Sequence, residues 1–319
     1  MKGIEKIVKT IAKSKNIVIA GHVNPDGDSI GSILSLGLGL EQLGKHVHII
    51  SQDGVPKRYR SLPGADRITK HASVTPDLAI SVDCGDRELL GDIFEVFRKA
   101  DTILEIDHHE FRRPFGDMRL IDNKAAAVGE LVYLLLKFLK VNITKEIAQN
   151  ILTSIIVETN SFKLPNVRDL TFFICADLMK SGVDFYKLSD TVFWSKTKES
   201  ALLLGICLTR CKFLKGRAIA WSIVRDEDFK RAGGSDEDVD PVTDELRSIK
   251  DVKVAILFRE RNNGSLRVSL RSKDGINVAS IAERYNGGGH FDSAGCKIPD
   301  DKASIKKVLS LAEDLLRVP

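Results

Sequence analysis

The stretch that decides the fold of this chain is Gly21-His22-Val23-Asn24-Pro25-Asp26-Gly27-Asp28-Ser29-Ile30-Gly31-Ser32. It follows the short apolar run of residues 17–20, whose length and β-branched side chains predict a buried strand. It leads into residues 30–43, whose apolar positions recur with helical periodicity. A strand that passes through a polar, glycine-containing turn into a helix is typical of α/β proteins, which build their sites at the carboxyl ends of strands.

The turn after this strand brings one imidazole and two carboxylates into seven residues, those of His22, Asp26 and Asp28. Asp26 and Asp28 fall on one side of an extended segment, and Gly27 lets the backbone pass closely between them. These carboxylates repel each other unless a cation neutralises them, and the ligand types suit a divalent transition metal. The alternative is a helix N-cap, in which Asp28 or Ser29 caps the helix and the turn binds nothing.

The composition is typical of a globular protein large enough for two domains, with 319 residues of which 43% are hydrophobic and 29% charged. A net charge of +4 argues against binding of nucleic acid over most of the surface. It remains compatible with a local basic groove. Residues 1–14 predict an amphipathic helix rather than a signal peptide, and no apolar run is long enough to span a membrane. We therefore expect a cytoplasmic protein.

The five cysteines include no C-x-x-C pair. Cys207 and Cys211 could share one face of a helix and hold a zinc ion. Unpaired thiols of this kind are more often small buried apolar groups, and we favour that role for both.

Apolar strands alternate with amphipathic helices through the first two-thirds of the chain. We predict strands at residues 47–50, 78–82 and 102–106, and helices at residues 126–139, 145–157 and 170–180. This alternation predicts an α/β fold with a mostly parallel sheet and helices on both faces. The last two of these strands end at Asp83 and at Asp107-His108-His109. Since the carboxyl ends of parallel strands meet at one sheet edge, these residues should lie beside the turn after the first strand.

The pattern changes after about residue 183. We predict a long helix at residues 196–211, strands at 218–224, 252–259 and 266–270, and a final helix at 304–316. The expected organisation is a first domain of residues 1–190, a connector helix within residues 191–212 and a smaller C-terminal α/β domain of residues 213–319.

The strand-end clusters supply enough ligands for two metal ions. His22, Asp26 and Asp83 could hold one ion, and Asp28, Asp83 and His108 a second, with Asp83 bridging them. Two ions bridged in this way lie about 3.5–4 Å apart, which suits attack of a bridging hydroxide on phosphorus. The mixture of imidazole and carboxylate favours Mn²⁺ over Mg²⁺, which prefers oxygen ligands alone.

These motifs together resemble those of the DHH phosphoesterase superfamily. The motifs that carry the resemblance, in the order the superfamily has them, are His22-x-x-Pro25-Asp26-Gly27-Asp28, Asp83, Asp107-His108-His109 and Gly287-Gly288-Gly289-His290. The glycine cluster, with Leu270-Arg271-Ser272 and Asn277-Val278-Ala279 before it, is similar to the DHH-associated domain of the RecJ-like subfamily. The resemblance covers nearly the whole chain. The length is similar to that of stand-alone members, which include oligoribonucleases that also dephosphorylate 3′-phosphoadenosine 5′-phosphate, and cyclic di-AMP phosphodiesterases.

The resemblance implies a role for each remaining residue. His109 would contact the scissile phosphate and Asp107 would orient the histidines. Arg271 offers a bidentate fork for phosphate, and the backbone N–H groups of a glycine cluster can bind an anion. Three successive glycines also fit a flexible turn that binds nothing. The expected substrate-binding residues are Arg271, Ser272, Gly287, Gly288, Gly289 and His290.

One departure from the family pattern concerns the second ion. The family's fourth motif usually reads Thr-Asp-Thr-Gly-Ser-Phe, whereas residues 157–162 read Val-Glu-Thr-Asn-Ser-Phe. Glu158 keeps the charge of the aspartate but adds a methylene, about 1.5 Å of reach. It could bind the ion directly or through water, or it could weaken the second site.

We expect a phosphoesterase that uses two Mn²⁺ ions, or Mg²⁺ or another divalent metal, to hydrolyse short RNA or a small nucleotide. The sequence does not rank short RNA, cyclic di-AMP and 3′-phosphoadenosine 5′-phosphate, or set the cleavage polarity. The alternative is a nucleotide-sensing protein whose catalysis is weakened by Glu158. A pyrophosphatase is less favoured because of the glycine–histidine cluster, and a dinucleotide-dependent oxidoreductase because no G-x-G-x-x-G follows the first strand. The sequence indicates no protein partner and leaves a homodimer open.

Overall fold

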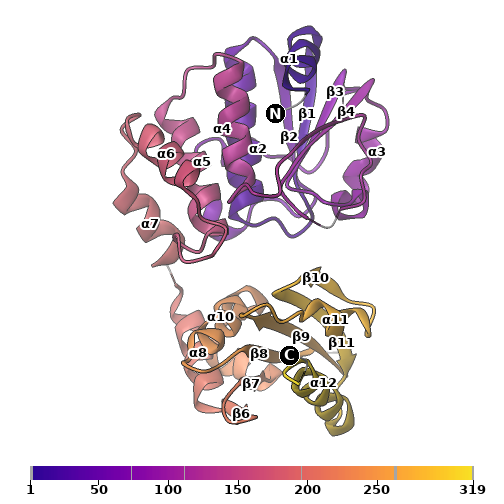
Figure 1. Cartoon of the computed structure of the whole chain (residues 1–319), viewed down its shortest axis with the longest axis vertical. Coiled ribbons are helices and arrows are strands. Elements are labelled where there is room, and N and C mark those ends of the chain that lie inside the picture. The colour runs from indigo at the N-terminus through magenta and orange to yellow at the C-terminus, as the bar shows by residue number, and fades with distance from the viewer. Residues whose placement is uncertain (1–2, 73, 111, 195, 262–263, 318–319) are drawn as a thin grey trace. The chain divides into compact units, whose positions relative to one another are not determined.

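The computed structural model describes residues 3–317, except residues 73, 111, 195 and 262–263. The chain divides into two compact units, residues 1–195 and residues 196–319 (Figure 1). Each unit has its own sheet and its own hydrophobic core. Among the described residues, the helices are too short or too polar to cross a membrane.

The sheet of the first unit has five parallel strands in the order β2-β1-β3-β4-β5. The strands are β1 (Asn16–Ala20), β2 (His46–Ile50), β3 (Leu78–Val82), β4 (Thr102–Asp107) and β5 (Met118–Ile121). All five residues of β3 are buried, as expected for the centre of a sheet that is covered on both faces. The predicted parallel sheet is confirmed. The short edge strand β5 was not predicted, because only four residues carry its pattern.

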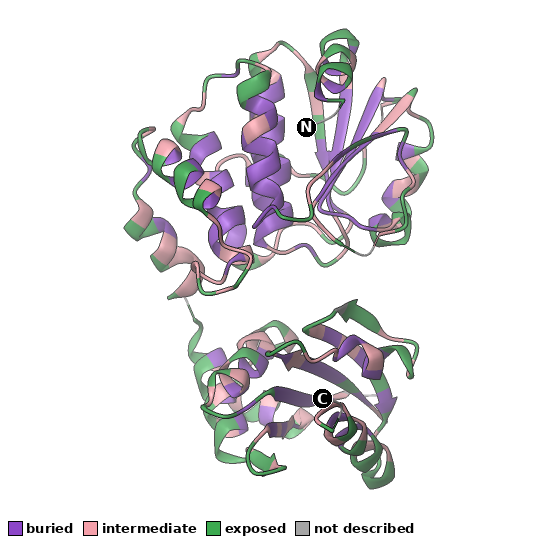
Figure 2. Cartoon of the chain, viewed as in Figure 1, coloured by how far each residue is buried: buried purple, intermediate pink, exposed green. Residues whose placement is uncertain are grey.

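Helices cover both faces of this sheet, which also confirms the predicted fold class. The main core lies on the face covered by α1 (Ile4–Lys13), α2 (Gly27–Gln42), α4 (Val128–Phe138) and α5 (Lys145–Glu158). Figure 2 shows α2 and α4 buried along most of their length. The other face carries a smaller core beneath a 3₁₀ segment (Arg87–Ile93) and α3 (Phe94–Phe97). Two further helices follow in this unit, α6 (Asp169–Met179) and α7 (Phe185–Phe193).

Close contact between α2 and α5 depends on Gly31. A Cβ added at Gly31 would lie 2.4 Å from the carbonyl oxygen of Asn150, which any larger residue would have to displace. This contact brings the carboxyl end of α5, with Glu158, toward the amino end of α2.

The sheet of the second unit has six strands in the order β10-β11-β9-β8-β7-β6, and only the β7–β8 pair is parallel. The strands are β6 (Lys212–Leu214), β7 (Ile219–Val224), β8 (Val254–Arg261), β9 (Ser265–Ser272), β10 (Gly288–His290) and β11 (Ser293–Pro299). The sequence pattern predicted β7, β8 and β9 but not the other three strands. The glycine cluster, for which a flexible turn was the alternative, contributes β10, which pairs with β11.

Helices also cover both faces of the second sheet. One face packs against α8 (Lys198–Thr209), α9 (Asp226–Ala232) and α10 (Asp240–Ser248), and the other against α11 (Ala279–Glu283) and α12 (Lys302–Leu315). The helix expected as a connector is α8, and it packs within the second unit through Leu203 and Cys207. Cys207 is fully buried in this core, which agrees with the expectation of a buried thiol.

Candidate metal centre

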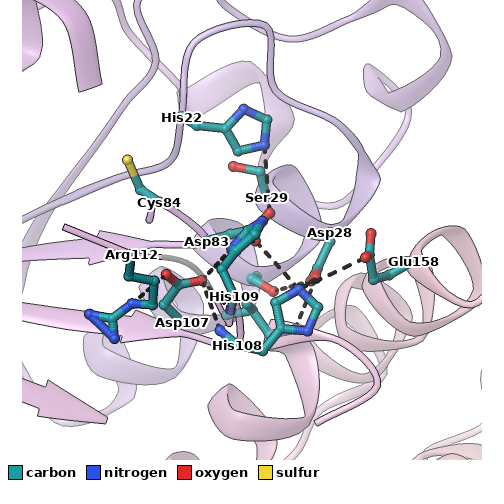
Figure 3. A network of polar contacts seen from close by, with 12 residues as sticks. His22, Asp28, Ser29, Asp83, Cys84, Asp107, His108, His109, Arg112 and Glu158 are labelled. Atoms are coloured by element: carbon teal, nitrogen blue, oxygen red, sulfur yellow. Dashed lines mark hydrogen bonds and ion pairs between the residues drawn. The ribbon is translucent and has the colours of Figure 1, made fainter. Parts of the chain in front are cut away.

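The predicted site residues of the first unit converge at one edge of its sheet (Figure 3). Except for Glu158, the last residue of α5, they lie at or after the carboxyl ends of β1, β3 and β4. β2 lies on one side of β1 and β3 on the other, so the strand order reverses beside β1. Open α/β sheets leave a crevice at this position, and ligands bind there.

His22 forms the first group with two carboxylates. Its Nε2 lies 3.6 Å from Oδ2 of Asp83 and 3.9 Å from Oδ1 of Asp26. Its Nδ1 lies 2.8 Å from the carbonyl oxygen of Val23, which can only accept a hydrogen bond, so Nδ1 is the donor. The lone pair of Nε2 in the neutral ring therefore faces the carboxylates. The separations are too long for strong hydrogen bonds but leave room for a cation at about 2 Å from each atom.

His108 forms a second group of the same design. Its Nε2 lies 3.8 Å from Oδ2 of Asp28, 3.9 Å from Oδ1 of Asp83 and 3.8 Å from Oε1 of Glu158. Its Nδ1 lies 3.0 Å from the carbonyl oxygen of Ala125, which again makes Nδ1 the donor. Asp83 thus presents Oδ2 to His22 and Oδ1 to the second group. His22 and His108 thus each direct Nε2 into the site, and the carboxylate of Asp83 lies between the two rings. This arrangement fits two divalent ions bridged by Asp83.

Asp28 is fully buried and accepts four hydrogen bonds. Ser154 Oγ donates at 2.6 Å and Ser32 Oγ at 3.1 Å, and the backbone N–H groups of Val128 and Gly129 donate at 2.9 and 3.3 Å. These two N–H groups open α4, whose own N-cap position makes no side-chain hydrogen bond. Asp28 therefore caps a helix that begins 100 residues later, where the helix dipole favours a negative charge.

Asp26 is the N-cap of α2, in place of Asp28 and Ser29, the two capping residues that the sequence suggested. Its Oδ1 accepts from the backbone N–H groups of Asp28 and Ser29 at 2.9 and 3.0 Å. The same Oδ1 faces His22, so the cap and the metal interpretations do not exclude each other. The hydrogen bonds hold this oxygen in place, as the second shell of a metal site does.

Asp83 has an uncommon backbone conformation. Its φ of 57° lies in the left-handed region, where residues other than glycine are rare. Its N–H donates to the carbonyl oxygen of Ile106 at 2.9 Å, which ties the residue to β4.

Asp107 joins His109 to the cluster. Its Oδ1 accepts from Nδ1 of His109 at 2.6 Å and from the backbone N–H groups of His108 and His109 at 2.8 and 3.2 Å. Its Oδ2 lies 3.1 Å from Nε of Arg112. Neither Arg112 nor its second partner, Glu105, was predicted from the sequence as a site residue. The signal that could have found them was the charge of Glu105 within an otherwise apolar strand, two residues before Asp107 and hence on the same face.

For His22, Asp83 and the two carboxylates of the first turn, burial has the largest influence on the pKa. It raises the pKa of Asp28 to about 7, and the charge of Asp83 adds to this. Burial and the charge of Asp83 also raise the pKa of Asp26. Burial lowers the pKa of His22, but the attraction of Asp83 outweighs it and brings this pKa to about 10. Asp83 keeps a pKa well below its usual range because its interaction with His22 outweighs its own burial. Without a cation, a proton on His22 thus balances part of the carboxylate charge.

The predicted substrate-binding residues lie in the second unit. Arg271 on β9 has its Nε 3.5 Å from Oδ1 of Asp244, and its side chain is partly exposed. Arg271 pairs with Ser293 on β11, which in turn pairs with His290 on β10, so the three residues form one row across the sheet. The side chain of His290 lies outside the described part of the structure.

Ser272 requires a correction. It is fully buried, and its hydroxyl donates to the carbonyl oxygen of Ile276 at 2.5 Å, so its side chain has no exposed surface to offer a ligand. Gly288 and Gly289, by contrast, are exposed on the outermost strand of the sheet. An edge strand has backbone groups that no neighbouring strand pairs.

The metal-type groups found among the described residues all belong to the first unit. One consists of His22, Asp26 and Asp83, the set expected for the first ion. The other shares Asp83 and His108 with the set expected for the second ion but has His109 in place of Asp28. Neither group includes a cysteine, and Cys84, which lies next to Asp83, is buried with its pKa raised to about 12 by that burial. The donor set is therefore imidazole and carboxylate, as predicted.

Similar proteins agree with this architecture over nearly the whole chain. A Thermus thermophilus protein named bifunctional oligoribonuclease and PAP phosphatase NrnA is 28% identical over 323 residues, which cover 99% of this chain and 95% of that protein. The crystal structure of an exopolyphosphatase-related protein from Bacteroides fragilis has a TM-score of 0.90 at 23% identity and covers 98% of this chain and 95% of that one. RecJ from Thermus thermophilus, solved in complex with Mn²⁺, has a TM-score of 0.59 at 14% identity and covers 100% of this chain. This chain spans 55% of RecJ.

Two family models match successive parts of the chain. Residues 16–156 match the N-terminal domain of the DHH family, and residues 216–318 match the DHHA1 domain. The first match contains every candidate metal ligand except Glu158, and the second contains the predicted substrate-binding residues. The chain therefore belongs to the DHH family and carries a DHHA1 domain after its DHH domain.

Proposed function

We propose that this protein is a divalent-metal-dependent phosphoesterase that hydrolyses short oligonucleotides or small nucleotides. The observation that carries the proposal is the geometry of Asp83, which turns one oxygen toward each of two imidazoles at 3.6 and 3.9 Å. Both imidazoles are held in the tautomer that binds metal. The name of the Thermus relative supports a nucleotide substrate.

Two Mn²⁺ ions suit the donor set best, and Mg²⁺ is the alternative. The first ion would be held by His22, Asp26 and Asp83, and the second by Asp28, Asp83, His108 and Glu158. When bound, such a pair supplies an activated water for attack on phosphorus and neutralises charge on the phosphoryl oxygens. RecJ structures solved with Mn²⁺ and with Mg²⁺ support a divalent metal by analogy of fold.

The protein's own groups would orient the phosphate. Nδ1 of His109 donates to Asp107, which orients the ring, and Nε2 would contact the scissile phosphate. Burial lowers the pKa of His109, but its hydrogen bond to Asp107 and the charge of Asp83 outweigh this and raise the pKa to about 9. The ring is therefore protonated at neutral pH and would attract the phosphate. Arg271 and the exposed edge of β10 would bind the rest of the nucleotide.

The test is an assay of the purified chain with Mn²⁺ against three substrates. They are a short RNA, cyclic di-AMP and 3′-phosphoadenosine 5′-phosphate, with inorganic pyrophosphate as the comparison for the related pyrophosphatase activity. We expect hydrolysis of at least one nucleotide, loss of it on chelation and its return when Mn²⁺ is added back. Turnover of pyrophosphate alone, or full nucleotide turnover in a rigorously metal-stripped sample, would contradict the proposal. Substrates of this kind occur in the cytoplasm, the location expected from the sequence.

A nucleotide-sensing role with weakened catalysis is the second candidate, because Glu158 replaces the family's aspartate. Its Oε1 lies 3.8 Å from Nε2 of His108, the same separation as Oδ2 of Asp28. The longer side chain thus reaches the second group, which favours the working enzyme over the sensor.

A further inference from the structure

A buried arginine lies behind the Asp107–His109 pair (Figure 3). Nη2 of Arg112 lies 2.5 Å from Oε2 of Glu105, and its Nε lies 3.1 Å from Oδ2 of Asp107. The side chain of Arg112 is 9% exposed and each carboxylate 1%. One guanidinium therefore joins two buried carboxylates that point to the same side of β4.

Glu105 holds this arginine in a fixed orientation. Its Oε1 accepts hydrogen bonds from the backbone N–H groups of Phe115, at 2.5 Å, and of Gly116. Its Oε2 is thereby directed at Arg112. Burying two carboxylates costs several kcal/mol for each ion unless charge and hydrogen bonds compensate, and Arg112 supplies the positive charge for both.

Arg112 in turn limits the positions open to Asp107. Oδ2 of Asp107 faces the guanidinium, while Oδ1 accepts from Nδ1 of His109 and from two backbone N–H groups. The contact of Oδ2 with Nε of Arg112 is an ion pair without a hydrogen bond. Its charge favours the orientation of the carboxylate in which Oδ1 accepts from Nδ1 of His109. Without Arg112, a buried Oδ2 would have no cation beside it and the carboxylate would be free to turn toward another donor.

We propose that Arg112, oriented by Glu105, is a positioning residue that acts through Asp107 to hold the orientation of the His109 ring. This inference rests on the proposed function only in assigning His109 to the phosphate. Arg112 touches neither candidate ion group; its partners lie on β4. Its effect should therefore appear in turnover rather than in metal or substrate affinity.

A merely structural role, in which Arg112 fastens its own loop, is the competing explanation. The loop has other attachments: the N–H of Arg113 donates to the carbonyl oxygen of Gly85 at 2.8 Å, and Asp117 exchanges hydrogen bonds with the backbone of Ile103 at 2.8 and 2.9 Å. The fold of the loop thus does not depend on Arg112 alone, and replacement of Arg112 should leave it in place.

Arg119 provides a matched control. It is also an arginine beside Glu105, with Nε 3.8 Å from Oε2, but its side chain is 51% exposed and its second partner is the carbonyl oxygen of Gly116. Substitution of Arg119 removes a cation from Glu105 while Arg112 still faces Asp107.

The first experiment compares Arg112→Met with Arg119→Met in steady-state kinetics with Mn²⁺. We expect kcat of Arg112→Met to fall about 10–100-fold, as for loss of an outer-shell partner, with KM and the Mn²⁺ titration midpoint within about threefold of wild type. Arg119→Met should stay near wild type in all three. The proposal would be overturned if kcat fell equally in both variants. It would also be overturned if Arg112→Met mainly raised KM or weakened Mn²⁺ binding.

A double-mutant cycle with His109→Ala separates positioning from structure. If Arg112 acts through His109, Arg112→Met should add less than about twofold to the loss already caused by His109→Ala. A structural defect would instead multiply the two losses. Should Arg112→Met fail to fold, Arg112→Lys keeps the charge but cannot bridge both carboxylates, and the same cycle with that variant decides.

A readout without turnover distinguishes failure of this proposal from failure of the proposed function. Imidazole ¹⁵N NMR of the metal-free full chain should show the proton of His109 on Nδ1, assigned by its absence in His109→Ala. The signal of this Nδ1–H, which donates to Asp107, should persist in Arg119→Met and shift or broaden in Arg112→Met. An unchanged Nδ1–H signal in Arg112→Met would refute the positioning role, whatever substrate the protein turns over.

Discussion

At the scale of single residues, Asp83 joins the two halves of the candidate centre. Its two oxygens face different imidazoles, and its left-handed backbone is held by a hydrogen bond to β4. Other carboxylates in the cluster serve one group each. Substitution of Asp83 should therefore affect binding of both metal ions, whereas substitution of Asp26 should affect only one.

The first prediction is that Asp83→Ala removes both bound metals, whereas Asp26→Ala weakens one. Activity of Asp83→Ala should fall more than about 100-fold, beyond the range for loss of outer-shell support. Metal stoichiometry is measured by titration of Mn²⁺ into the metal-free protein, followed by electron paramagnetic resonance. A milder effect at Asp83 than at Asp26 would rule out the bridging role.

The second prediction concerns Glu158, whose carboxylate lies 3.8 Å from His108. Glu158→Gln should lower Mn²⁺ affinity and rate together, because an amide oxygen is a weaker ligand than a carboxylate. Glu158→Asp should keep or improve both, since it restores the family's residue. Initial rates of the three proteins are compared across a Mn²⁺ titration. Superimposed curves would mean that Glu158 is structural and that the second site is completed elsewhere or is absent.

The third prediction follows from the raised pKa of His22, about 10, and of Asp28, about 7. Both groups hold protons near neutral pH in the metal-free protein, and metal binding must displace them. Mn²⁺ affinity should therefore rise as pH increases from 6 to 8, with release of protons. Calorimetric titrations in two buffers of different ionisation enthalpy measure the number released, and His22→Ala should release fewer. Binding that is independent of pH and buffer would contradict this account.

At the scale of elements, the glycine cluster forms the edge strand β10 instead of a flexible turn. Gly287 lies where a Cβ would be 2.2 Å from the carbonyl oxygen of Gly295, so its lack of a side chain lets β10 approach β11. A Cβ at Gly288 would meet nothing within 4 Å. Gly287 is therefore required by the packing of β10, whereas the packing does not require glycine at position 288.

The fourth prediction uses this difference. Gly287→Ala should destabilise the second unit, because the added methyl overlaps the backbone of β11. Gly288→Val should leave the thermal unfolding midpoint unchanged but raise KM for the nucleotide, since a side chain would block close approach of phosphate to the backbone. Kinetics and thermal unfolding are measured on both variants. If Gly288→Val behaves as wild type in both, the edge of β10 does not bind substrate.

At the scale of the whole molecule, the chain divides its candidate machinery between two units with separate cores. The metal-type groups among the described residues belong to the first unit, and the predicted phosphate contacts belong to the second. Because the two sets share no residue, their contributions to affinity and chemistry should be separable.

The fifth prediction is that Arg271→Ala raises KM for the nucleotide about tenfold to over a hundredfold, from the roughly 1.5–3 kcal/mol of a hydrogen bond to a charged group. Mn²⁺ binding and hydrolysis of bis-p-nitrophenyl phosphate, a small artificial diester, should hardly change. Arg267→Ala is the control, since Arg267 lies on the same strand and its side chain is more exposed than that of Arg271. Equal loss of both activities, with loss of metal, would assign Arg271 to the catalytic centre or to the fold.

Sequence alone determined the parallel sheet of the first unit and the clusters at its strand ends. Apolar runs such as Ile17 to Ala20 carry their pattern within a few residues, and parallel pairing then brings their carboxyl ends together. The meeting of His22, Asp83 and His108 follows from these local patterns. The second unit was less predictable, because β6 and β10 have three residues each and exist only through pairing with longer strands.

Only the tertiary structure decided which groups hold the candidate ligands in place. Asp28 caps α4 from 100 residues away, and this depends on helices α2, α4 and α5 packing together through positions such as Gly31. Arg112 reaches Asp107 because its loop folds back along β4, and Ser272 is buried because its turn closes on Ile276. Hydrogen bonds of this kind join residues that no local periodicity relates, and their stability depends on burial that exists only once the core has formed.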